Sequence, residues 1–147
     1  MDNCSGKFLM KKLGLDMGDV WVGMAISDGA GITCRPYETV KLDQLEEFLK
    51  KVFDQELIDT VVVGHPVTVG GGRVSEQTKS VEKIFEILRS KFSSANHGEI
   101  KWVLWDERFS SKRAASMMKG QEKKKEHSIA AAFILQNYLD GQALLTE

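Results

Sequence analysis

The chain has 147 residues, 42% of them hydrophobic, and a formal net charge of −1. This length is that of one ordinary domain with its own core, so residues 1–147 are predicted to form a single domain. The near-neutral charge excludes a global attraction to nucleic acid, so a polyanionic partner would need a local basic patch. Two cysteines are too few for a disulfide framework, and no apolar stretch is long enough to span a bilayer. We expect a cytoplasmic protein, or an organellar one if a targeting segment has been removed.

Three strand-like segments open the chain, at residues 13–17, 20–27 and about 32–41, with glycine- and aspartate-rich turns between them. Links this short predict that the three strands are antiparallel neighbours. Residues 43–46 (DQLE) have the pattern of a capping box, and apolar residues at helical spacing predict a helix over 44–56.

The second half of the sequence alternates between strand and helix patterns. Residues 60–63 (TVVV) predict a strand that is buried on both faces. After it we expect a loop over 67–73, a helix over 75–92, a loop over 93–98, a strand over 101–106, a short helix after Ser110 or Ser111 and a last helix from about 124 to 140. The order β-β-β-α-β-α-β-α-α predicts an α/β fold, with a mixed five-stranded sheet and helices on its faces.

Acidic residues stand at two strand ends that are far apart in the sequence. Asp16 closes the first apolar segment, and Asp106 and Glu107 come at the end of the strand over 101–106. Acids at strand ends are how a sheet gathers oxygen ligands for a divalent cation. Because side chains alternate along a strand, Asp106 and Glu107 should point differently, so only one should face the metal. The alternative is that these acids are turn residues or caps of the following helix.

A glycine-rich loop follows the strand over 60–63. It contains Gly70-Gly71-Gly72 and Arg73, and His65 precedes it. A loop in this position lies at the edge where α/β sheets bind ligands, and its glycines let backbone N–H groups approach a phosphate. His65 and Arg73 are therefore candidate substrate contacts. The alternatives are a mobile surface loop for the glycines and a structural role for a histidine that precedes proline.

A basic segment leads to His127 at the start of the last helix. Its cations are Lys112, Arg113, Lys119, Lys123, Lys124 and Lys125. Such a cluster is a candidate for contacts along a nucleic-acid backbone, and Arg108 can bind a phosphate through its guanidinium fork. The alternatives are a solvated loop for the cluster and an ion pair with Asp106 for Arg108.

Four segments together resemble the YqgF (RuvX-like) family of the ribonuclease H-like superfamily, described as Holliday junction resolvases and as pre-16S rRNA nucleases. They are LGLDMG (13–18) with VGMAISD (22–28), VVVGHP (61–66), WDERFSS (105–111) and HSIAAAFILQNYLD (127–140). The resemblance implies a ribonuclease H-like fold and phosphodiester hydrolysis with a divalent cation, Mg²⁺ or Mn²⁺. It also implies a nucleic-acid partner, either structured RNA such as a ribosomal RNA precursor or branched DNA.

The resemblance also implies the residues of the site. Asp16 matches the acid of the family's first strand, and Asp106 and Glu107 match its acidic pair, with Asp16 and Glu107 favoured as metal ligands. The family usually has an aspartate where this chain has His127, which makes His127 the third candidate ligand. An imidazole suits Zn²⁺ or Mn²⁺ better than Mg²⁺.

Other roles stay open for His127. It could bind a metal-held water, move a proton or contact a phosphate. It could instead mark a catalytically weakened member that binds RNA or the ribosome. The chain is expected to act as a monomer or a homodimer, and a junction resolvase that makes paired cuts should be a symmetric dimer.

Overall fold

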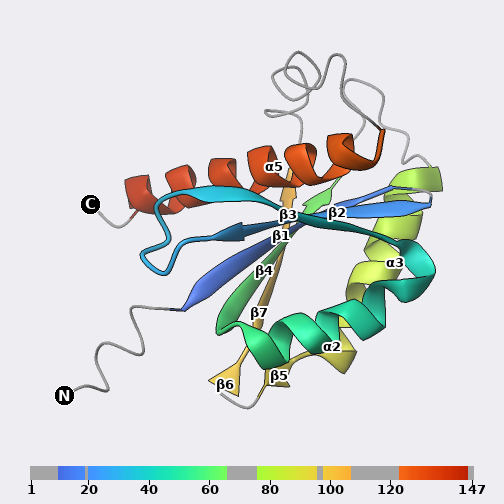
Figure 1. The fold of residues 1–147 in the computed structure, drawn as a ribbon, viewed down its shortest axis with the longest axis horizontal. Coiled ribbons are helices and arrows are strands. Elements are labelled where there is room, and N and C mark those ends of the chain that lie inside the picture. Colours follow the sequence, from blue (N-terminus) through green and yellow to red (C-terminus); the bar gives the residue numbers. More distant parts are fainter. Residues whose placement is uncertain (1–9, 19, 66–75, 96–97, 107–122, 146–147) are drawn as a thin grey trace.

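The computed structural model describes residues 10–18, 20–65, 76–95, 98–106 and 123–145. Its main sheet has the strand order β3-β2-β1-β4-β7, and helices cover both faces (Figure 1). The strands are β1 (Lys11–Met17), β2 (Trp21–Ser27), β3 (Cys34–Lys41), β4 (Ile58–His65) and β7 (Lys101–Asp106). The α-helices of the described ranges are α2 (Leu45–Gln55), α3 (Glu76–Lys91) and α5 (Lys123–Leu145).

The strand directions confirm the predicted mixed sheet. β2 lies antiparallel between β1 and β3, whereas β4 and β7 run parallel to β1. The carboxyl-terminal ends of β1, β4 and β7 therefore meet at one edge of the sheet. Their last residues are Met17, His65 and Asp106, so Asp16 lies one residue from this edge.

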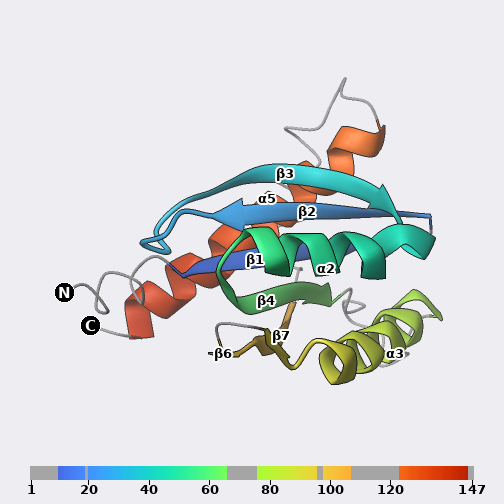
Figure 2. The same ribbon diagram turned by 60° about the horizontal axis from the view of Figure 1, so that its bottom comes forward.

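Each face of the sheet has its own hydrophobic core. Helices α2 and α3 cover the face that carries Leu13 and Leu15, and α5 covers the face that carries Val62 (Figure 2). Alternation along β1 explains this division, because residues two apart point to the same face. Gly14 and Asp16 consequently face α5.

Helix α5 lies unusually close to the sheet because glycines stand beneath it. A Cβ atom at Gly14 would lie 2.8 Å from Cβ of Leu135, and one at Gly23 would lie 2.0 Å from the backbone carbonyl of His127. A glycine in a strand interior is typical of such close approach. These two positions fix the height of α5 above β1 and β2, and with it the position of His127.

Strand ends differ from the predicted bounds because polar residues continue the pairing. β1 begins at Lys11, and β4 runs from Ile58 to His65, whereas the apolar pattern predicted 13–17 and 60–63. Lys12 forms an ion pair with Asp59 at 2.7 Å, which joins the two polar strand starts. In contrast, β3 begins at Cys34, later than predicted.

Three further details correct the sequence-based expectations. The loop expected over 93–98 holds two short antiparallel strands, β5 (Ser94–Ala95) and β6 (Gly98–Glu99). The capping box is wrong, because Leu42–Gln44 form a 3₁₀ turn and neither this turn nor α2 has a side-chain cap hydrogen bond. Helix α5 continues past residue 140 to Leu145, and Gly141 lies beside the ring of Trp105. The loop over 67–73 and the short helix after Ser110 or Ser111 lie outside the described residues.

No helix within the described ranges combines the length and apolar character needed to cross a bilayer.

Cys34 provides a test of the contact between β3 and α5. Its Sγ donates a hydrogen bond to the carbonyl oxygen of Ala132 at 3.1 Å, and burial raises the pKa of the Cys34 thiol from 9.0 to about 11. Since the thiolate is the nucleophile, we expect alkylation by iodoacetamide at pH 8 to be about 100-fold slower in the folded chain than in denaturant. Peptide-resolved mass spectrometry measures this rate. Equal rates in the two conditions would contradict the packing of Cys34 under α5.

Candidate active site

Asp16 and His127 come together at the carboxyl-terminal edge of the parallel strands, although 111 positions separate them in the sequence. Oδ2 of Asp16 lies 3.1 Å from Nδ1 of His127. Strand β1 carries the carboxylate, and the first turns of α5 place the imidazole over it. The two side chains are 18% and 28% exposed, so the pair is partly shielded from water and still open to a ligand.

Two glycines leave room for this pair. Gly23 lies opposite Asp16 in the register of β1 and β2, and its missing side chain lets the backbone of His127 sit on the strand. A Cβ atom at Gly18 would lie 2.7 Å from Cε1 of His127. The sequence indicated a turn next to Gly18 but gave no sign of this second role, because the crowding comes from a helix more than 100 residues away.

The electrostatics of the pair favour a charged imidazole in the absence of metal. The hydrogen bond with Asp16 raises the pKa of His127 above its ordinary value of 6.5. Burial acts in the opposite direction, while the negative charges of Asp16 and Glu126 raise the pKa further. An imidazolium next to a carboxylate is the form that these contacts stabilise.

The titration of His127 tests this pairing. In the metal-free chain we expect His127 to titrate above pH 6.5, and Asp16→Asn should lower that pKa because it removes the largest cause of the rise. Since the folded-state pKa is raised, the pair stabilises the fold below the unfolded pKa, and this contribution is lost as pH rises through the folded pKa. Proton NMR of the imidazole Cε1–H group measures the titration, with His127→Gln to assign the signal. Identical titrations in wild type and Asp16→Asn would show that the residues do not pair.

His65 lies away from this pair. Its Nε2 contacts Oε2 of Glu82 in α3 at 2.9 Å. It also follows Val63 by two residues in β4, and Val63 belongs to the core under α2 and α3. The structure therefore places His65 on the face opposite Asp16, and its contact with Glu82 favours the structural alternative over a substrate contact.

The structure describes the backbone of some of the other predicted site residues. Asp106 ends β7 beside His65, so its backbone lies at the same edge as Asp16, two strands away. Lys123, Lys124 and Lys125 begin α5, which brings their backbone near the same edge. The other candidates lie outside the described residues and stay predictions: Glu107, Arg108, Arg73, Lys112 and Arg113.

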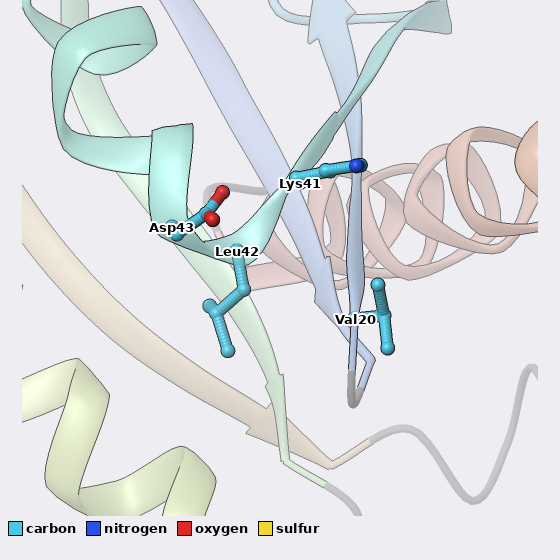
Figure 3. Close-up of a pocket in the computed structure, with 4 residues that line it drawn as sticks. All are labelled: Val20, Lys41, Leu42 and Asp43. Atoms are coloured by element: carbon cyan, nitrogen blue, oxygen red, sulfur yellow. The ribbon is translucent and has the colours of Figure 1, made fainter.

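One cation at this edge was not singled out from the sequence. Lys41 ends β3 opposite Trp21, and its Nζ lies 5.9 Å from the centroid of the Trp21 ring. It lines a hollow of about 330 Å³ with Val20, Leu42 and Asp43, and Figure 3 shows its amine directed away from Asp43. Only the strand register reveals this placement, because an isolated lysine at a strand end carries no sequence signal.

The Asp16–His127 pair fits a divalent cation by donor type and by spacing. A carboxylate and a neutral imidazole are both ligands that Mn²⁺ accepts. Adjacent ligands of an octahedral ion with bonds of about 2.1 Å lie about 3 Å apart, which is close to the observed separation. Within the residues that the structure describes, no group of three or more His, Cys, Asp or Glu could hold a metal ion. A third protein ligand would have to come from outside them, where Glu107 is the predicted one.

A mixed five-stranded sheet of this order, with helices on both faces, is the ribonuclease H-like fold. Solved structures agree on the fold. Thermus thermophilus RuvC in complex with a Holliday junction substrate matches with a TM-score of 0.53 and 13% identity, over 91% of this chain and 96% of that chain. A second RuvC structure from the same organism matches with a TM-score of 0.50 and 12% identity over the same shares.

The sequence comparisons identify the family. Residues 10–141 match the RuvX family, described as Holliday junction resolvase. A relative from Geobacillus sp. (strain WCH70), named "Putative pre-16S rRNA nuclease", is 33% identical over 144 residues, which cover 90% of this chain and 99% of the relative. One of the same name from Caldicellulosiruptor bescii is 35% identical over 139 residues, covering 89% and 96%. The chain belongs to the RuvX family of phosphodiester-hydrolysing nucleases, which confirms the resemblance found in the sequence.

Proposed function

We propose that this chain is a metal-dependent endonuclease that processes ribosomal RNA precursor. The observation that carries the proposal is the Asp16–His127 pair, which sits at the carboxyl-terminal edge of the parallel strands with a spacing that suits one cation. The names of the sequence relatives support a ribosomal RNA substrate. Branched DNA is the second candidate, favoured by the family description and by the likeness to RuvC.

In this proposal Asp16, Glu107 and His127 hold the cation, Mg²⁺ or Mn²⁺. When bound, such an ion activates water and offsets charge on the phosphate oxygens. Asp16 supplies a carboxylate held by β1, and in the metal-free chain its hydrogen bond keeps the imidazole ring of His127 beside it. His127 must lose its extra proton before it can act as a ligand, so we expect cation affinity to rise with pH.

Cations around the same edge would bind the nucleic-acid backbone. They are Lys41 together with the predicted contacts Arg73, Arg108, Lys112, Arg113, Lys123, Lys124 and Lys125. Because the net charge of the chain is −1, attraction to a polyanion has to be local. We further propose that residues 1–147 act as one domain in the cytoplasm, as a monomer when processing RNA and as a dimer if the substrate is a junction.

The experiment that tests this function compares two labelled substrates, a ribosomal precursor RNA and a four-way DNA junction, each with Mg²⁺ or Mn²⁺. We expect metal-dependent cleavage of the RNA and a monomer by light scattering. Paired cuts in the junction by a dimer would favour the second candidate. Binding of RNA without cleavage of either substrate would contradict a nuclease and indicate a non-catalytic binding module.

Restoring an acid at position 127 should change the metal preference. Aspartate offers a hard oxygen in place of the imidazole nitrogen, so we expect His127→Asp to raise the ratio of Mg²⁺-supported to Mn²⁺-supported cleavage rates about tenfold. His127→Asn is the matched control, because it has the size of aspartate without the charge. An unchanged ratio in His127→Asp would exclude position 127 as a metal ligand.

A further inference from the structure

A second pocket opens at the opposite edge of the sheet from Asp16, with a volume of about 360 Å³. Its floor is formed by one residue from each of three parallel strands. Lys12 of β1 lies beside Thr60 of β4, and Thr60 lies beside Lys101 of β7. The last turns of α5 form its roof with Tyr138, Leu139 and Gln142, and the turn at residues 29–31 closes one side. Figure 1 shows this turn next to the end of α5, far along the helix from its start.

Tyr138 is a buried polar residue that lines this pocket. The residue is only 4% exposed, and its ring packs edge-on against Trp105, with 5.3 Å between the ring centroids. Within the described residues its hydroxyl makes no hydrogen bond, and the residue lines the pocket. Burial and the charge of Asp59 raise the pKa of Tyr138, so the phenol stays protonated and can donate a hydrogen bond.

Two lysines line the pocket, and one of them, Lys12, forms an ion pair with a carboxylate. Nζ of Lys12 donates to both carboxylate oxygens of Asp59, at 2.7 and 2.9 Å, which neutralises that lysine. The hydroxyl of Thr60 also donates to Asp59, at 3.0 Å. Lys101 is exposed and lines the pocket, and it forms no ion pair with any residue that the structure describes, so it supplies the uncompensated positive charge.

The donors approach from both layers of the molecule. Lys101 comes from the sheet below, and Tyr138 and Gln142 come from the helix above. A planar carboxylate accepts hydrogen bonds mainly in one plane, whereas a tetrahedral phosphate has oxygen atoms on every side. Donors on two opposite sides of a pocket therefore suit a phosphate better than a carboxylate. Met10 and Leu139 give part of the pocket an apolar lining.

We propose that this pocket binds a phosphate group, carried by a mononucleotide or by a nucleic-acid strand, with Tyr138 and Lys101 as its principal donors. The site is separate from the Asp16–His127 pair and lies at the amino-terminal ends of the parallel strands. Binding there requires no nuclease activity, so the proposal stands or falls independently of the proposed function.

The test uses the full chain with inorganic phosphate, adenosine 5′-monophosphate and a 5′-phosphorylated ten-nucleotide RNA, followed by ¹H–¹⁵N NMR. We expect shifts at residues 29–31, 60, 101, 138 and 142. Tyr138→Phe, which keeps the ring contact with Trp105, and Lys101→Gln should each weaken binding about tenfold. Lys83→Gln on α3 is the matched surface control, and it should bind as wild type does.

The two phosphate sources are distinguished by which probe responds. Binding of the mononucleotide indicates a free nucleotide, whereas a response to the RNA alone, sensitive to Tyr138→Phe and Lys101→Gln, indicates a strand. The proposal is overturned if no probe shifts these residues at about 10 mM, a weak-binding limit. It is equally overturned if both folded variants bind as wild type does.

Discussion

Replacing Asp16 with asparagine should reduce RNA cleavage about a thousandfold or more, which is the scale of losing a principal charge-stabilising group. Asparagine keeps the size of the side chain but removes the negative charge that attracts both a cation and the imidazolium of His127. Affinity for RNA should change little, because the backbone contacts that we propose come from the surrounding cations.

Single-turnover cleavage at saturating RNA measures this effect, with affinity measured separately by filter binding. Asp54→Asn is the matched control, since Asp54 is an exposed acid on α2 and undergoes the same chemical change. If Asp16→Asn and wild type cleave equally fast, the cleavage comes from a contaminant or from a site elsewhere.

Among the glycines that the structure describes, Gly23 should tolerate an added methyl group least. Its Cβ would lie 2.0 Å from the carbonyl carbon and oxygen of His127 and 2.4 Å from the backbone nitrogen of Ser128. Backbone atoms cannot rotate away as a flexible side chain can, so α5 has to lift off β2. We expect Gly23→Ala to lower the free energy of unfolding by about 3 kcal/mol, the upper range for overpacking. The separation of His127 from Asp16 should abolish cleavage as well.

Urea unfolding and the cleavage assay together check this result. Gly31→Ala is a useful comparison, because nothing lies within 4 Å of a Cβ there and only the positive φ of 71° opposes it. That variant should lose about 1 kcal/mol and keep its cleavage rate. A Gly23→Ala protein as stable and active as wild type would contradict the close packing of α5.

Histidine at position 127, where the sequence resemblance implied an aspartate, gives the metal-free pair an attractive charge interaction. Two carboxylates at this distance would repel each other, whereas the imidazolium of His127 attracts Asp16. The raised pKa of His127 reflects that attraction. The metal-free pair is therefore stabilised by the extra proton of His127, and in the proposed metal site the cation takes the place of that proton.

The sequence predicted those features that depend on local patterns. Apolar spacing predicted the helices and the apolar parts of the strands, and the lengths of the links between strands predicted the mixed sheet. The place of Asp16 at a strand end also came from such a pattern, and its role as a metal ligand stays a prediction. The apolar patterns did not predict the first residues of β1 and β4. Lys12 and Asp59 in these positions are polar and form an ion pair with each other, so they carry no apolar pattern. The role of Gly23 and the side on which His65 lies depend on contacts between distant segments, so local patterns could not reveal them.

The account depends most on Asp16 and His127 sharing one cation. Anomalous diffraction from crystals soaked in Mn²⁺ above the pKa of His127 tests this directly. We predict a manganese peak within about 2.5 Å of both an Asp16 carboxylate oxygen and an imidazole nitrogen of His127. Manganese bound only elsewhere, with Asp16 still hydrogen-bonded to His127, would contradict the proposed metal site.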